Sequence, residues 1–375
     1  MIAQSVHVTT IRGIRVGVHY SWLIIFFLVT FSLTGQFAVE HPGWSLSERV
    51  TLAVATSLLF FGCILLHELA HSVVAQAKGI PVRSITLFIF GGVAQIGREP
   101  DRPLTEFLIA IAGPIASFLL ALGFYLLARL AGEQALHLAA LADWLASINF
   151  AIAMFNLLPG FPLDGGRVFR AVVWAVTGSF TKATRIASRS GQAVGFAFIM
   201  GGTAIAFTGN WVNGLWLAFI GWFLLDAAQQ SGLQVVMRSA LAGLVAQDVM
   251  TRDCPTVSGR LSLAELVEDY FLKTGERCFV VSDNGRLDGL ITLHQVKTIP
   301  RDRWEHTTLS SAMTPLARLH LVTPETPILK VLEVMEAGDV NQVPVVTGNR
   351  LLGMISREHL LSVLYARMEL GSQTA

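Results

Sequence analysis

The sequence contains little charge and little cysteine. Only 14% of its 375 residues are charged, whereas a soluble globular protein carries about 25%, so an entirely soluble protein is excluded. Its three cysteines, Cys63, Cys254 and Cys278, are too few for a disulfide framework and give no sign of an oxidising compartment. A net charge of +1 without a clustered basic surface means that nucleic acid is not an expected partner.

The scarce charge is unevenly distributed along the chain. Residues 1–240 contain 14 Lys/Arg and 10 Asp/Glu, while residues 241–375 contain 13 and 16. The first part therefore has the charge density of a membrane protein, and the second part that of an ordinary soluble domain. We predict a transmembrane domain over residues 1–235, followed by soluble domains.

Six apolar segments are long enough to cross a bilayer, for which a helix needs about 20 apolar residues. The first segment is too long and too far from the N-terminus for a signal peptide. The last stretch, Ser190 to Leu225, contains no charged residue, and a turn signal at Thr208-Gly209-Asn210 divides it into two helices. The predicted spans are residues 18–39, 51–77, 106–129 and 135–158, and two within 190–225.

The short loops between these spans set the orientation. Twelve Lys/Arg fall on one side of the membrane, and only Arg49 and Arg129 fall on the other. Because positive loops stay in the cytoplasm, we predict a multi-pass protein of the cell membrane with both termini and the soluble part in the cytoplasm.

The second predicted span contains His67-Glu68-Leu69-Ala70-His71. Residues i and i+4 share a helix face, so both imidazoles can reach one metal with Glu68 beside it. In such a motif the two His bind zinc, and the carboxylate takes a proton from water whose pKa the metal lowers to about 7. The helix before the motif is uncharged, so these polar residues are costly unless they pair or bind metal. A metal site is favoured over a polar cluster between helices.

A catalytic zinc takes three protein ligands, so a third must come from elsewhere. Asp143 and His137 belong near the opposite membrane face. Glu106 and Asp226 lie near cytoplasmic ends of spans, where their side chains are expected to reach the headgroups. Asp164 remains, in a segment whose prolines and glycines prevent a continuous helix. Such backbone at membrane depth suits a ligand-bearing loop that faces the substrate, and the second span is expected to pack against the fourth.

The His-Glu-Leu-Ala-His segment, together with Asn-x-x-Pro-x-x-Pro-Leu-Asp-Gly-Gly-Arg at the end of a later span, resembles the site-2 protease family of intramembrane zinc metalloproteases. The resemblance covers about residues 1–230. It implies one zinc ion per chain, a general base, and an Asn that positions the substrate or polarises its carbonyl. The residues carried over are the zinc ligands His67, His71 and Asp164, the base Glu68, and Asn156.

Three further positions bear on this resemblance. Asn149 fits the family's N-x6-N-L-L-P pattern with no assigned purpose, and Ala112-Gly113-Pro114 matches the family's A-G-P. The family often continues with Asn where this chain has Ser117, so no role is carried to that position.

Residues 84–96 are rich in β-branched and aromatic side chains around a Gly pair, which predicts a short membrane-associated hairpin. In relatives this segment is a membrane-inserted loop that forms strands. A protease needs its substrate as extended backbone, and a sheet edge can supply the hydrogen bonds that an unwound substrate loses. Substrate contact is therefore expected here, the alternative being a purely structural hairpin.

The soluble part contains an internal repeat of about 64 residues. Val249-Met250-Thr251 recurs as Ala312-Met313-Thr314, and residues 278–292 recur as 343–356. The repeat resembles a tandem pair of CBS domains, which we predict over residues 245–301 and 306–368 as a soluble α/β module.

CBS pairs resemble adenine-nucleotide sensors, in which a Thr or Ser is followed three residues later by an Asp that grips the ribose. Here Gln295 follows Thr292, and His359 follows Ser356. The missing carboxylates favour a pair that serves homodimerisation, or docks over the membrane domain, over one that binds an adenine nucleotide.

The predicted fold is a polytopic α-helical membrane protein with about six transmembrane helices and a hairpin, joined to a soluble tandem CBS module. The predicted function is hydrolysis of transmembrane protein substrates within or near the bilayer, in regulated intramembrane proteolysis, with the CBS pair regulating activity or access. The alternatives are an inactive scaffold, and a transporter or channel with a CBS tail. The latter predicts polar residues spread to the outer face, but the sequence concentrates them at one depth.

Overall fold

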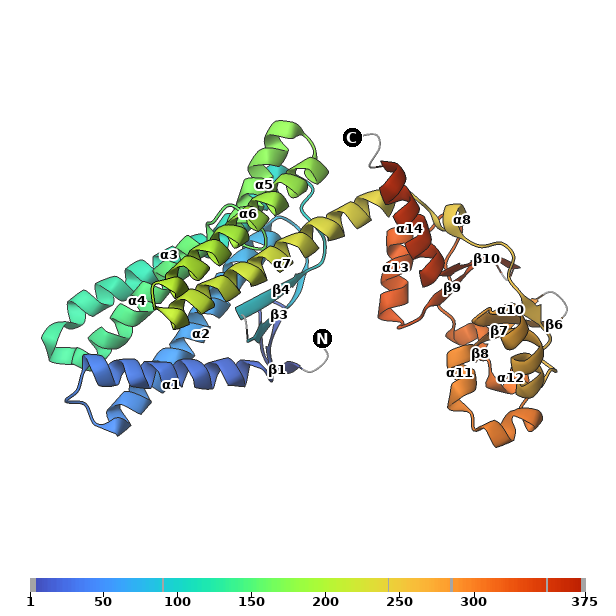
Figure 1. The fold of residues 1–375 in the computed structure, drawn as a ribbon, viewed down its shortest axis with the longest axis horizontal. Helices are drawn as coiled ribbons and strands as arrows, with labels where there is room; N and C mark the ends of the chain where they lie inside the picture. The colour runs from blue at the N-terminus through green and yellow to red at the C-terminus, as the bar shows by residue number, and fades with distance from the viewer. Residues whose placement is uncertain (1–4, 90, 242, 284–285, 349, 372–375) are drawn as a thin grey trace. The chain divides into compact units, whose positions relative to one another are not determined.

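The computed structural model describes residues 5–371 except 90, 242, 284–285 and 349. The chain divides into two compact units, Met1–Leu233 and Gln234–Ala375. The first, which we call the membrane unit, is mostly helical, and the second, the tail, combines short strands and helices (Figure 1).

Within the described part of the membrane unit, six helices are long and apolar enough to cross a bilayer, which confirms the predicted number of spans. Their outer faces carry bare apolar side chains: Phe31, Leu130 and Phe207 are each more than 80% exposed, as expected of surfaces that face lipid. The predicted turn at 208–210 does separate the last two. The helices are α1 (Trp22–Glu40), α2 (Leu46–Ala77), α3 (Pro103–Ala131), α4 (Leu136–Asn156), α6 (Phe180–Phe207) and α7 (Trp211–Leu241).

The predicted hairpin at 84–96 is present, but it belongs to a larger sheet that also contains an N-terminal hairpin absent from our prediction. The strand order is β1-β2-β3-β4, with β2 and β3 parallel and the other two pairs antiparallel. Among the described residues β4 therefore forms an edge of the sheet. The strands are β1 (Ser5–Ile11), β2 (Ile14–His19), β3 (Val82–Phe88) and β4 (Gly91–Ile96).

Helix α3 is central to the packing of the membrane unit, since it contacts α2, α4 and α5 (Asp164–Thr177). Contact between α2 and α4, the second and fourth spans, is also present. Helix α2 starts where Ser45 and Glu48 form a capping box, which satisfies otherwise unpaired N–H groups. A turn of 3₁₀ helix, Gly132–Ala135, joins α3 to α4.

Helix α5 starts directly after a non-helical segment at 157–163, as the prolines and glycines there predict. A Cβ at Gly165 would overlap the backbone of Leu157, and one at Gly166 the backbone of Gly160. Both glycines are therefore required for the close approach of α5 to the segment before it.

The tail contains two similar copies of a strand–helix–strand–strand–helix pattern. Strands β5 to β8 form one sheet in the order β5-β6-β7-β8, and β9 and β10 form a second. The repeat positions 284–285 and 349 lie outside the described residues. The strands are β5 (Thr256–Val257), β6 (Cys278–Asp283), β7 (Arg286–Thr292), β8 (Thr314–Pro315), β9 (Gln342–Thr347) and β10 (Arg350–Ser356).

Short helices cover these strands. In the first copy a π-turn, Leu266–Phe271, interrupts the first long helix, and 3₁₀ turns follow at Arg301–His306 and Leu316–Arg318. The α-helices are α8 (Ala246–Val249), α9 (Leu263–Glu265), α10 (Leu272–Thr274), α11 (Leu293–Thr298), α12 (Leu309–Ala312), α13 (Ile328–Ala337) and α14 (Arg357–Gly371).

The two copies exchange their leading segments. Thr251 of the first copy forms a bridge with Met354 in the second, while Thr314 of the second pairs with Leu290 in the first. The cores follow the same exchange, because Leu309 packs in the core of the first copy. Each copy thus completes the other, and the pair folds as one unit.

Candidate metal site

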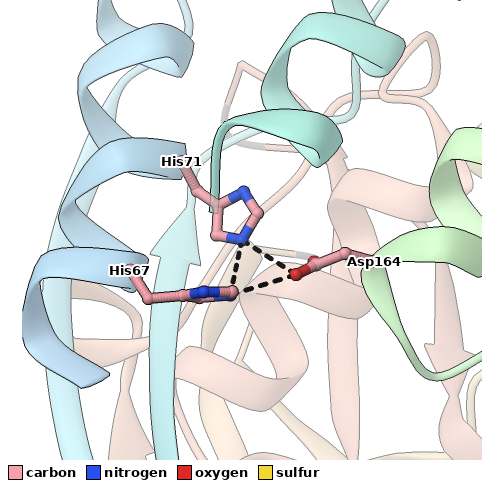
Figure 2. A group of neighbouring side chains, drawn as sticks. All are labelled: His67, His71 and Asp164. Carbon is pink, nitrogen blue, oxygen red and sulfur yellow. Dashed lines mark hydrogen bonds and ion pairs between the residues drawn. The ribbon is translucent and has the colours of Figure 1, made fainter. Parts of the chain in front are cut away.

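His67 and His71 lie one helical turn apart on α2, and both are buried. Asp164, the first residue of α5, reaches them from a separate helix. Its Oδ2 lies 3.1 Å from Nε2 of His67 and 3.1 Å from Nε2 of His71, and the two Nε2 atoms are 3.2 Å apart. Figure 2 shows both rings and the carboxylate pointing at one another. The structure therefore brings together all three predicted ligands.

The arrangement fits a metal ion on the chemistry of its donors. Two imidazole nitrogens and one carboxylate oxygen, all within 4.8 Å of one another, form the three-ligand set of a catalytic zinc site. Gly113 of α3 keeps the space beside them open, because a Cβ there would overlap the Nε2 atoms of both rings.

Helix α3 orients both imidazoles through their other nitrogens. Nδ1 of His71 donates to the backbone carbonyl of Ile109 at 2.6 Å, and Nδ1 of His67 lies 2.8 Å from the Ser117 hydroxyl. When the proton of an imidazole is on Nδ1, its Nε2 keeps a lone pair. In both histidines this Nε2 is the atom that faces Asp164. Sequence analysis assigned no role to Ser117. Its spacing of four residues from Gly113, on the same helix face, is the signal that was missed.

Glu68 lies next to the edge of the sheet. A Cβ at Gly92 of β4 would come within 2.5 Å of Glu68 Cγ and 3.3 Å of Oε1. The Glu68 side chain thus packs against β4 at Gly92, and a larger residue there would displace it.

The two asparagines of the family pattern are placed differently. Asn156 is the last residue of α4 and is half-buried. Asn149 is buried, and its amide donates to the carbonyl of Leu145 one turn earlier in α4.

The expectation that Glu106 reaches the lipid headgroups is wrong. Glu106 is fully buried and pairs with Arg170 of α5. The carboxylate turns inward because a buried guanidinium on a neighbouring helix supplies its counter-charge. The remaining rejected candidates are exposed: Asp143 lies 3.8 Å from Arg129, and Asp226 accepts a hydrogen bond from its own helix.

The tail contains a cavity of about 770 Å³ that is lined by Thr292 and Ser356, the positions at which nucleotide-binding CBS pairs carry their Thr or Ser. Thr292 caps α11, and the Gln295 side chain binds back to the Thr292 amide and to the Thr314 hydroxyl of the other copy. Gln295 therefore bridges the two copies at the position where an Asp was expected. Four cationic side chains also line the cavity: Arg277, Lys297, Arg318 and Arg357.

Two family descriptions match the chain, Peptidase family M50 over residues 55–137 and 129–202, and CBS domain over residues 245–300 and 309–366. A relative from Mycobacterium tuberculosis with the name "Putative zinc metalloprotease Rip3" is 34% identical over 92% of this chain and 89% of its own length. The similarly named sll0528 of Synechocystis is 33% identical over 96% of each chain. A solved structure, the site-2 protease of Methanocaldococcus jannaschii, is 26% identical over 61% of this chain and 95% of that chain, with a TM-score of 0.41.

Proposed function

The chain belongs to peptidase family M50, the site-2 protease family of zinc metalloproteases, and on that premise we propose how its own residues perform the hydrolysis. It is a multi-pass membrane enzyme with a CBS pair, and its substrate is membrane-embedded protein. The transporter or channel alternative has no support among its relatives. One observation supports the proposal most strongly: the metal-binding atoms of His67 and His71 on α2 and of Asp164 on α5 all lie within 4.8 Å of one another.

The proposed ligands of one zinc ion per chain are His67, His71 and Asp164. When bound, zinc supplies a Lewis acid that lowers the pKa of water and polarises a carbonyl. The hydrogen bonds to Ile109 and Ser117 keep both Nε2 atoms available as ligands.

Glu68 is proposed as the general base and acid. It lies one residue after His67 on α2, so its carboxylate can take a proton from the attacking water and deliver it to the leaving amine. Asn156, at the end of α4, is proposed to position the substrate or polarise its carbonyl.

The edge of β4 is proposed to receive the substrate. A strand added there would make backbone hydrogen bonds and hold the peptide extended. Contact between Gly92 and Glu68 supports this proposal, because it brings the sheet edge next to the proposed base.

The substitution Glu68→Gln tests the hydrolytic mechanism. The purified full chain with this change is expected to bind one zinc per chain, as the wild type does, and to lose cleavage of a membrane-embedded substrate. Asp226→Asn, an exposed change outside the site, is the matched control and should cleave normally. A Glu68→Gln protein that cleaves at the wild-type rate contradicts the mechanism.

The termini and the tail are proposed to lie in the cytoplasm, from the excess of Lys/Arg in the loops on that side. This orientation is tested by introducing single cysteines at exposed positions of the protein and treating intact cells with a membrane-impermeant thiol reagent. The reagent should label Arg129→Cys and leave His7→Cys unlabelled.

The tail is proposed to regulate the protease. Its cavity is lined by four cationic side chains and two carboxylates, those of Asp339 and Glu358, and this excess of positive charge suits the phosphates of an adenine nucleotide. Exposed Leu361 and Tyr365, one turn apart on α14, suit contact with a second copy. Calorimetry of the full chain with AMP and ATP tests the first proposal. The mass of the detergent-solubilised chain, with and without Tyr365→Glu, tests the second.

A further inference from the structure

We infer that the buried ion pair between Glu106 and Arg170 is a positioning device for the metal site, in which Arg170 sets where Asp164 stands relative to the two histidines. The inference rests on the zinc ligands proposed above. Neither Glu106 nor Arg170 takes part in the proposed hydrolytic mechanism.

Arg170 connects four parts of the membrane unit. It donates through Nε at 2.6 Å and through Nη2 to the same carboxylate oxygen of Glu106 on α3, and Nη1 lies 3.5 Å from the Thr184 hydroxyl on α6. Its guanidinium lies over the rings of Phe161, before α5, and Phe180, on α6, at 5.0 and 4.5 Å. A planar guanidinium that donates two hydrogen bonds and also packs against two aromatic rings can adopt few other positions.

The Glu106 end of the pair lies on the helix face that orients the histidines. Ile109, Gly113 and Ser117 follow Glu106 at intervals of three and four residues, so all four share one buried face of α3. Through Ile109 and Ser117 this face holds His71 and His67. A side chain that is held by Glu106, such as Arg170, therefore has a defined position relative to both imidazoles.

The Arg170 end lies on the helix that begins with Asp164. The segment before Asp164 is non-helical, so the position of this carboxylate depends on where α5 is held. Arg170 lies six residues later in the same helix and is 6% exposed. The pair thus ties the helix that carries one ligand to the helix that orients the other two.

A buried ion pair is weak evidence for stability, because the loss of solvation offsets the attraction between the charges. Its directional, two-donor geometry instead favours one relative position of α3 and α5. This distinguishes a positioning role from a purely stabilising one, and the two make different predictions for a change of arginine to lysine.

The test compares Arg170→Lys with Arg129→Lys in the purified full chain. Lysine retains the charge at 170 but cannot form the two-donor fork. Zinc dissociation constants are measured by competition with a chromophoric chelator, and the coordination geometry by the visible absorption spectrum after cobalt(II) replaces zinc. Arg170→Lys should weaken zinc binding about 10- to 100-fold, as changes beside metal ligands do, and should alter the cobalt spectrum. Arg129, whose side chain lies exposed 3.8 Å from Asp143, provides the matched control, with both readouts unchanged.

A protein with Arg170→Lys that unfolds at a lower temperature, yet has wild-type zinc affinity and cobalt spectrum while folded, overturns the inference. If that variant does not fold, Glu106→Asp decides by the same readouts, since it keeps the charge but shortens the reach to Arg170. A wild type that binds no zinc instead overturns the proposed function, and the inference with it.

Discussion

The membrane unit and the tail differ in which side chains they bury. Among the described residues, the buried polar side chains lie in the membrane unit, and they include His67, His71, Glu106 and Arg170. The tail, although soluble in composition, has described cores built from apolar residues and Cys278. Buried polar groups are costly unless they have partners. His67 and His71 contact Asp164, and Arg170 pairs with Glu106, whereas the described cores of the tail contain no such polar contacts.

The largest effect is expected at the shared carboxylate. Asp164→Ala removes one of the three proposed ligands, and we expect zinc to be absent from the purified chain and cleavage to fall by about 10³-fold or more. Metal analysis and a cleavage assay measure both. Asp143→Ala, an exposed carboxylate of the same unit, should retain zinc, and an Asp164→Ala protein with full zinc content would refute the assignment of this ligand.

The second largest effect is expected at Gly113, which leaves space beside the two imidazoles. Gly113→Ala places a methyl group against both Nε2 atoms, so zinc affinity should fall at least about 10-fold. Gly123→Ala is the matched control, since it adds the same methyl to the same helix with nothing within 4 Å. Equal zinc affinities for the two variants would mean that the ligands stand differently when metal is bound.

A smaller effect is expected where the sheet edge meets Glu68. Gly92→Ala should displace the Glu68 side chain and lower kcat about 10-fold, because the proposed base is misplaced, while zinc content stays at one per chain. The neighbouring exposed position, Val93→Ala, should change neither quantity. Loss of zinc together with activity in Gly92→Ala would indicate damage to the metal site instead.

The sequence predicted elements and motifs whose signals are local. The six spans, the His67–His71 pair and the repeat of the tail follow from apolar runs, short spacings or self-similarity. Asp164, which lies 97 residues from His67, was instead reached by eliminating other candidates and by the family resemblance. What it did not predict depends on contacts between distant elements: the Ser117 hydroxyl lies 50 residues from His67, and Arg170 lies 64 residues from Glu106. In a single sequence, nothing marks which lone polar residue on one helix will meet another across the interior.

The same limit applies to the tail. The repeat indicated two copies, but the exchange of Thr251 and Thr314 between them is a long-range pairing that spacing alone does not reveal. The absent carboxylates were visible in the sequence, and the structure adds that Gln295 bridges to Thr314 instead.

Gln295→Asp would introduce into the tail the carboxylate that nucleotide-binding relatives use. If the cationic cavity binds phosphates, AMP affinity should rise a few-fold, because an acceptor for the ribose hydroxyls is gained at the expense of one hydrogen bond to Thr314. Calorimetry of the full chain measures the change, with Gln342→Asp on the same cavity wall as the control. Equal AMP affinities would show that the lost carboxylate does not limit binding.

A pH effect is expected at the one ionisable side chain that the described cores of the tail bury. Burial raises the pKa of the Cys278 thiol to about 12, against about 8.5 in an unfolded chain. The unfolded state therefore loses this proton first, so the stabilisation is complete below about pH 8.5 and is lost as the pH rises toward 12. In that window the free energy of unfolding should fall by about 1.4 kcal/mol per pH unit from this group alone. Hydrogen exchange of the β6 amides measures this slope, and Cys278→Ala should reduce it by that amount. If the free energy of unfolding has the same pH dependence in the wild type and in Cys278→Ala, ionisation of the thiol does not oppose folding. Cys278 would then not be buried in an apolar environment.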